Sequence, residues 1–126
     1  MRLSSRVWTI RVFVAVLFSM MGLIVGCHSY HIEATIENHT GGAITLLEVD
    51  YPSASFGSDK LAADADFHYR FQTRGSGPLT VQYTAANGHQ VQMSGPTLYE
   101  RQEGRLDIVL LPGGKAEFRP ALNPQR

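Results

Sequence analysis

The sequence predicts an all-β domain that follows an apolar N-terminal helix. Three observations support this prediction. Apolar and polar residues alternate with a period of two through most of the chain after residue 30, as they do in strands with one buried face. Glycine, proline and asparagine separate these stretches, and these residues favour turns. No stretch after residue 30 has the apolar spacing of an amphipathic helix.

The first 26 residues have the composition of an export signal. Three arginines within residues 1–11 precede a run from Val12 to Val25 that carries no charge. A basic start, an apolar middle and a small residue before the cut are the parts of a secretory signal peptide. The run has fourteen residues, which as a helix reach about 21 Å against about 30 Å of hydrocarbon. A cleaved signal therefore fits better than a permanent transmembrane helix.

The end of this apolar run resembles the lipobox of bacterial lipoproteins. Ile24 takes the branched apolar position, Gly26 the small position, and Cys27 the position that the family modifies. The resemblance implies that the chain is cut between Gly26 and Cys27, that the Cys27 thiol receives a diacylglyceryl group, and that the new amine is acylated. Two or more acyl chains hold a protein firmly on a membrane. Ordinary cleavage without lipid and an uncleaved anchor are the alternatives.

The chain from Cys27 onward sets limits on fold and partners. Its hundred residues suit one domain. Cys27 is the only cysteine, so its use for lipid leaves no disulfide to stabilise the fold. Eight basic residues against eleven acidic ones give this part a net charge of −3, and no basic run is present. A nucleic-acid partner is therefore not expected.

The first two predicted strands follow the anchor closely. Residues 27–30 form the lipidated N-terminus and a tether of about 10 Å at full extension, so the domain should lie close to the membrane surface. Tyr30–Asn38 alternates regularly and predicts the first strand, and Ala43–Tyr51 predicts the second. The alternation changes phase between Leu46 and Leu47, which indicates either a β-bulge or burial on both faces.

A long loop and the clearest strand follow. Pro52–Asp66 has the composition of a loop, and Phe56 within it is expected to fill the edge of the core. Asp66–Thr73 places three aromatic residues on one face. Asn87-Gly88 predicts a hairpin between strands at 79–85 and 89–94, and Gly95-Pro96 is expected to end the second of these.

The last quarter of the chain predicts two more strands. Leu106–Leu111 is a nearly continuous apolar run, as expected for a central strand that is covered on both faces. Lys115–Arg119 predicts a short last strand, and residues 120–126 are expected to form a loose tail. The predicted domain therefore spans residues 31–119.

Seven short strands with turn signals at most boundaries predict an antiparallel β-sandwich of immunoglobulin-like or transthyretin-like type. A small barrel is the alternative. The cysteine and tryptophan marks of antibody domains are absent from the predicted domain, so the prediction concerns architecture only. The stretches Tyr51–Gly57, Tyr69–Phe71, Leu79–Tyr83 and Asn87-Gly88 resemble those of small uncharacterised bacterial lipoproteins, which implies a location and a shape without an activity.

No pattern of residues points to catalysis, a metal or a cofactor. The sequence lacks a nucleophile elbow, a phosphate loop and a metalloprotease motif. His28 and His31 are suitably spaced for a metal, but two histidines beside an anchor do not make a site. Five acidic residues in polar stretches could place two carboxylates in one cleft for acid–base chemistry: Asp59, Asp64, Asp66, Glu100 and Glu103.

The sequence therefore predicts a non-catalytic, lipid-anchored protein of the bacterial cell envelope. It should face the periplasm, with the outer membrane favoured over the inner because His28 rather than aspartate follows the cysteine. We expect it to bind a partner protein near the membrane, with Phe56, His68 and Tyr99 as candidate contacts. A small-ligand binder for sugar or metal, using Phe56, His68 and the 52–66 loop, is the alternative, and a hydrolase is the third.

Overall fold

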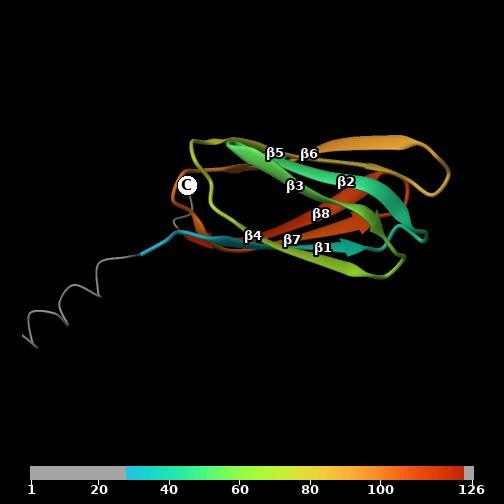
Figure 1. Ribbon diagram of the computed structural model, residues 1–126, viewed down its shortest axis with the longest axis horizontal. Helices are drawn as coiled ribbons and strands as arrows, with labels where there is room; N and C mark the ends of the chain where they lie inside the picture. The colour runs from blue at the N-terminus through green and yellow to red at the C-terminus, as the bar shows by residue number, and fades with distance from the viewer. Residues whose placement is uncertain (1–27, 124–126) are drawn as a thin grey trace, which may run out of the picture.

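The computed structural model describes residues 28–123, which form two β-sheets packed face to face (Figure 1). No helix in this range is long and apolar enough to cross a membrane. Eight strands follow one another along the chain: β1 (Ile32–Asn38), β2 (Ile44–Tyr51), β3 (Ala54–Leu61), β4 (Asp66–Phe71), β5 (Gly77–Thr84), β6 (Gln90–Leu98), β7 (Glu103–Leu111) and β8 (Lys115–Asn123).

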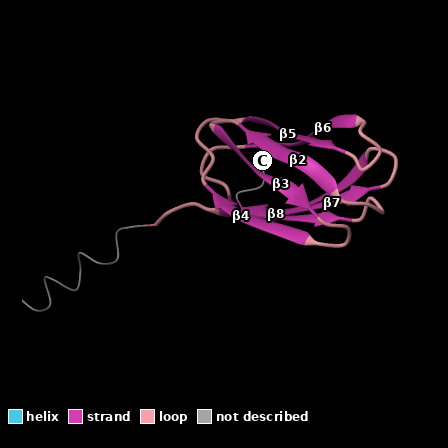
Figure 2. Ribbon diagram, turned by 45° about the vertical axis from the view of Figure 1, so that its right-hand side comes forward, coloured by secondary structure: helices cyan, strands magenta, loops and turns pink. Residues whose placement is uncertain are grey.

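The strands divide equally between the two sheets. One sheet has the order β4-β1-β7-β8, which we call sheet A, and the other has the order β3-β2-β5-β6, which we call sheet B. Edge strands β3 and β4 contact each other across the sandwich, and so do β6 and β8. Figure 2 shows the two layers from a second direction. The all-β sandwich predicted from the alternation is therefore confirmed.

The core lies between the sheets and is built by the alternating residues. Ile32 and Ile36 on β1, and Leu106 and Ile108 on β7, are fully buried. Their polar neighbours point out to solvent, because successive side chains of a strand face opposite ways. β7 lies between β1 and β8 and buries Val109 on its second face as well, which accounts for its apolar sequence.

The strand count differs from the prediction because β3 lies inside the segment that was expected to be a loop. The strand pairs with β2 across a tight turn, with Tyr51 opposite Ala54. It buries only Phe56 and Leu61, and its other residues are the serine, glycine and aspartate that favour loops. An edge strand with one face in water needs few apolar residues. Burial of Phe56 confirms its predicted place in the core.

Two predicted strand ends were wrong. β6 continues through Gly95 and Pro96 to Leu98, and a proline is tolerated there because β6 is an edge strand. β8 continues through Pro120 to Asn123 instead of ending at Arg119. The described strands therefore extend from residue 32 to residue 123, beyond the predicted last strand residue, 119, and the first part of the predicted loose tail is strand.

The pairing pattern also differs in one place from the predicted antiparallel arrangement. β1 and β7 pair in parallel, while all other neighbours are antiparallel. The predicted hairpin is confirmed: the Ala85 N–H donates to the His89 carbonyl at 2.8 Å, and Gly88 has the positive φ that such turns require. Of the two alternatives for the change of phase in β2, the bulge is correct, because the register shifts between Thr45 and Glu48.

One buried asparagine joins three segments at an end of the sandwich. Asn38 is fully buried, and its side-chain amide donates to the carbonyls of Gly42, Leu61 and Ala62 at 2.8–3.1 Å. Its carbonyl oxygen accepts from the Thr40 hydroxyl at 2.7 Å. The side chain therefore fixes the loops after β1 and β3 to each other. Asn38 also begins the triplet Asn38-His39-Thr40, which matches the acceptor pattern for N-glycosylation, but its amide is buried and hydrogen-bonded.

The loops gather at two opposite ends. Residues 28–31 leave the sandwich beside the β4–β5 and β6–β7 loops (Figure 1), and we call this the tether end. The β1–β2, β3–β4, β5–β6 and β7–β8 connections form the distal end. If the chain is held by lipid at residue 27, the distal end is the one turned away from the membrane.

Candidate functional site

The bulge in β2 puts a large apolar side chain into solvent. Leu46 has a φ of 52°, in the left-handed region that few residues other than glycine and asparagine adopt. Its side chain is 66% exposed, whereas Leu47 turns into the core and is 2% exposed. The extra residue thus lets two adjacent leucines point in opposite directions, one inward and one outward.

The neighbouring strand is adapted to this bulge. Gly57 on β3 lies opposite Glu48, and a Cβ placed on Gly57 would stand 2.0 Å from the carbonyl oxygen of Leu47. Only glycine allows the backbones to approach this closely. The bulge therefore depends on the backbone of Leu46 on β2 and on Gly57 on β3, so the fold of sheet B fixes the exposed position of this leucine.

Polar side chains surround Leu46 on the outer surface of sheet B. We call this surface the bulge face, defined by Leu46, Glu48, Asp50, Gln82 and Gln92. A hollow of about 520 Å³ separates Leu46 from β5 and β6, and another of about 330 Å³ separates it from β3. The residues of β5 and β6 on this face are uncharged: Thr80, Gln82, Thr84, Gln90, Gln92 and Ser94.

Two carboxyl groups lie next to each other on the bulge face. Glu48 and Asp50 are two residues apart on β2 and so share its outer side. The pKa of Asp50 is raised above 3.8, first by partial burial, then by a hydrogen bond with Glu48 and by the charge of Glu48. Within residues 28–123 neither group forms an ion pair with a basic side chain. The five residues of the bulge face therefore carry only negative charge. Lys60 of β3, opposite Thr45 on the same outer surface, forms no ion pair with them.

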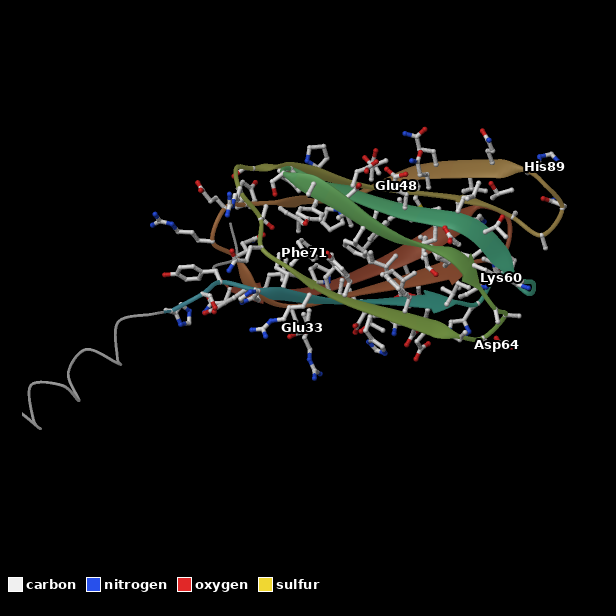
Figure 3. All side chains as sticks on the ribbon, viewed as in Figure 1. Glu33, Glu48, Lys60, Asp64, Phe71 and His89 are labelled. Carbon is white, nitrogen blue, oxygen red and sulfur yellow. The ribbon has the colours of Figure 1, made fainter. Side chains whose placement is uncertain are left out.

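The outer surface of sheet A has a different character, because its charges are paired. Arg70 and Glu33 are 3.3 Å apart, and Arg119 and Glu117 are 3.1 Å apart. Figure 3 shows Glu33 and Glu48 pointing away from the sandwich on opposite faces, with Phe71 between the sheets. The balanced face of sheet A offers less to a charged partner than the bulge face does.

The structure separates the three residues that the sequence suggested as contacts. Phe56 is 6% exposed and stacks against Tyr69 at 4.4 Å between ring centres. His68 is exposed on the outer side of sheet A, with its Nδ1 3.0 Å from the Thr35 hydroxyl. Tyr99 is half-buried in the β6–β7 loop. Gly26 and Cys27 lie outside the described residues.

The histidines and acidic residues are also scattered. Nε2 of His28 lies 2.9 Å from Glu103 at the tether end, and His39 lies 3.5 Å from both Glu37 and Asp64 at the distal end. Among residues 28–123 no three histidine, cysteine, aspartate or glutamate side chains are grouped so that they could hold a metal ion. Asp59 lies beside the bulge.

A hollow at the distal end has an uncharged wall apart from one histidine. Its volume is about 490 Å³, and loops after β1, β5 and β7 line it. Tyr83 forms part of this wall and is 3% exposed, and burial raises the pKa of its hydroxyl. Within the described chain that hydroxyl has no hydrogen-bond partner. Its neighbours in the wall are mostly glycine, alanine and polar side chains.

Sequence reasoning found the bulge but missed what the bulge does. The change of phase between Leu46 and Leu47 was the signal, and it did not indicate which leucine faces water. The carboxyl pair could have been read from Glu48 and Asp50, which lie two apart in a predicted strand. The distal hollow has no local signal, because three loops far apart in the sequence form it.

Comparison with known proteins supports the fold alone. No protein-family model and no curated protein matches this chain. An NMR structure of a protein from Eubacterium rectale matches with a TM-score of 0.54 and 13% sequence identity, and the match covers 80% of this chain and 97% of that one. The likeness agrees with the two-sheet architecture and carries no information on function.

Proposed function

We propose that this chain is a lipid-anchored protein of the bacterial cell envelope and that its sandwich binds another protein through the bulge face. One observation carries the binding proposal: Leu46 is 66% exposed and held in a left-handed conformation. A strained backbone that presents an apolar group in water is a feature typical of functional sites. The polar surroundings resemble the rim of a protein interface.

The chemistry of the bulge face indicates the kind of partner. Leu46 stands between two hollows that a partner's apolar side chains could fill. Glu48 and Asp50 lie beside it and would attract a lysine or arginine of the partner, since complementary charges steer association. We therefore propose a partner whose contact surface combines an apolar patch with a basic side chain. The protein needs no catalytic group for this role.

The anchor is supported by the sequence of residues 1–28, with Cys27 as the lipidated residue. Mass spectrometry of the membrane fraction tests it directly. The mature protein should begin at Cys27 and carry acyl chains, and a Cys27→Ala variant should lose them. An unmodified wild-type protein in the soluble fraction would contradict the anchor. It would not affect the binding proposal, which has a separate test.

We further propose that the sandwich is of the transthyretin-like type. Constant immunoglobulin domains place their first two strands in the same sheet, whereas β1 and β2 of this chain lie in different sheets. The eight-stranded order β4-β1-β7-β8 facing β3-β2-β5-β6 therefore supports the second of the two predicted types.

Photocrosslinking in cells tests the bulge face. A benzophenone side chain at Gln92 should form an adduct with an envelope protein, while one at Arg105 on sheet A serves as the control position. Leu46→Asn should lower the adduct yield about tenfold or more, since burying a leucine contributes about 1.5–3 kcal/mol. Asparagine tolerates the left-handed backbone, so the fold should survive.

Leu46→Met is the matched variant, because it keeps an apolar side chain at the bulge. It should retain most of the adduct. Equal adduct yields from wild type and Leu46→Asn would show that the bulge does not bind the partner, and equal yields at Gln92 and Arg105 would contradict a specific face.

A small uncharged ligand in the distal hollow is the second candidate. It is favoured by Tyr83, which lines the hollow and whose hydroxyl forms no hydrogen bond within the described chain, so that this hydroxyl could bind a polar ligand. A neutral disaccharide such as chitobiose should then raise the melting temperature of the wild-type protein and have a smaller effect on Tyr83→Phe.

A further inference from the structure

The tether end contains a small hollow that none of the roles above uses. Its volume is about 250 Å³. Residues 28–30 form one side, residues 72–74 of the β4–β5 loop form another, and Glu100 and Arg101 of the β6–β7 loop complete it. The hollow therefore opens directly beside the start of the described chain.

Thr73 lines this hollow, and its hydroxyl is buried without a hydrogen-bond partner in the described chain. Thr73 is 5% exposed, and its Oγ1 forms no hydrogen bond within residues 28–123. A buried polar atom without a partner costs about 1–3 kcal/mol. Such a cost is best explained if a bound ligand or water forms a hydrogen bond with the atom.

Two arginines stand at the same hollow. Arg74 and Arg101 are exposed and form no ion pair within the described range. Arg101 has a φ of 65°, which is costly for a side chain of this kind. One carboxylate, Glu100, lies among them, and the neighbouring Glu103 already contacts His28 at 2.9 Å.

The loops that carry these arginines are fixed in place. The Tyr99 N–H donates to the side-chain oxygen of Gln102 at 2.9 Å, and the Gln102 N–H donates back to the Tyr99 carbonyl at 3.3 Å. The Glu100 N–H donates to the Ser76 hydroxyl at 3.2 Å, which connects the two loops. The site is therefore organised before any ligand arrives.

We propose that this hollow binds the phosphate of a membrane phospholipid and so docks the tether end on the bilayer. Guanidinium groups bind phosphate through paired hydrogen bonds, and the Thr73 hydroxyl adds a third donor. The proposal rests on the proposed lipid anchor: three residues from Cys27 span about 10 Å, within reach of the headgroups. Tyr30, 38% exposed, suits the interface, where aromatic side chains with a polar tip gather.

Hydrogen exchange of the mature, acylated full chain tests this site. In vesicles of phosphatidylethanolamine and phosphatidylglycerol, amides of residues 72–76 and 99–102 should exchange about tenfold more slowly than in nonionic detergent micelles. The combined variant Arg74→Gln with Arg101→Asn should lose that protection. Arg105→Gln with Arg119→Gln, on the outer side of sheet A, should keep it.

Thr73→Val separates binding from folding. It should melt at the same or a higher temperature than wild type in micelles, because it removes an unpaired buried hydroxyl, while its protection in vesicles should fall. Absence of extra protection in wild-type vesicles would overturn the proposal, as would equal protection from millimolar inorganic phosphate in micelles. The acylated mass is checked on the same sample, so failure of docking is distinguished from failure of the anchor.

Discussion

Position 46 is occupied by leucine although its backbone lies in the left-handed region. Glycine or asparagine would fit this backbone with less strain, by about 1 kcal/mol, and would not expose an apolar side chain. The same strand carries two carboxyl groups on one face, Glu48 and Asp50. Single residues of β2 thus lower the stability of the isolated domain, as residues at binding sites often do.

The carboxyl pair predicts a dependence of stability on pH. The folded state raises the pKa of Asp50 above 3.8, so it holds this proton more tightly than the unfolded chain does. Ionisation of Asp50 therefore opposes folding. It lowers the free energy of unfolding at pH values above the raised pKa, and this effect disappears as pH falls below 3.8. Asp50→Asn should melt at a higher temperature than wild type at neutral pH and at nearly the same temperature in acid.

Glu117→Gln is the matched variant, and it should change the melting temperature at neutral pH in the opposite direction to Asp50→Asn. The hydrogen bond from Arg119, and then its charge, lower the pKa of Glu117. The stability that this pair contributes is therefore present at neutral pH and lost in acid. Glu117→Gln should melt at a slightly lower temperature than wild type at neutral pH. If both variants raised the melting temperature, the pKa shifts of these carboxyl groups would not be the cause.

Strand pairing between β2 and β3 depends on a single glycine. A methyl group on Gly57 would collide with the carbonyl oxygen of Leu47, so β3 would have to shift away from the bulge. Gly57→Ala should lower the free energy of unfolding by about 1–3 kcal/mol, as overpacking does. Denaturant unfolding measures this as a lower midpoint, and Ser55→Ala on the same strand should change it by less than about 0.5 kcal/mol.

At the scale of elements, the sequence predicted the strands that bury an alternating face and missed those that do not. β1 and β5 have regular apolar alternation and were found. β3 and the second half of β8 are edge segments rich in serine, glycine, proline or charge, and local composition favours a loop there. Pairing with a neighbouring strand overrides that preference, and a neighbour distant in sequence leaves no local signal.

At the scale of the molecule, the distal end is held by Asn38. Its amide donates to the carbonyls of Gly42, Leu61 and Ala62. The Gly42 carbonyl also accepts from the Thr40 hydroxyl and the Ala62 carbonyl from the Ala65 N–H, so Asn38→Ala would chiefly remove a donor from the buried Leu61 carbonyl. That variant should lower the free energy of unfolding by about 1–3 kcal/mol, since a buried group that loses its hydrogen-bond partner costs about that much. Exposed Thr45→Ala is the control, and a small loss from Asn38→Ala would mean that water replaces the amide.

The candidate sites could be predicted only in part, because they depend on how the sheets face each other. The sequence suggests Phe56 and Tyr99 as aromatic residues near strand ends, and His68 as a side chain that points outward from its strand. The sandwich sends them to the core, to the outer side of sheet A and to the tether end. The hollow at the tether end joins residues near 30, 73 and 100, and only the pairing of β1 with β4 and β7 brings these together.

The place of β1 inside sheet A has a consequence for how the chain assembles. Ile32 pairs with Phe71 on one side and with Gly104 on the other, so β1 cannot complete its pairing before β7 is present. Contacts between such distant residues form slowly, and a chain made from its N-terminus onward cannot close this sheet until residues 104–110 have been made. The export that we propose for this chain would benefit from that delay, because a polypeptide whose sheet is still open can cross a membrane in extended form.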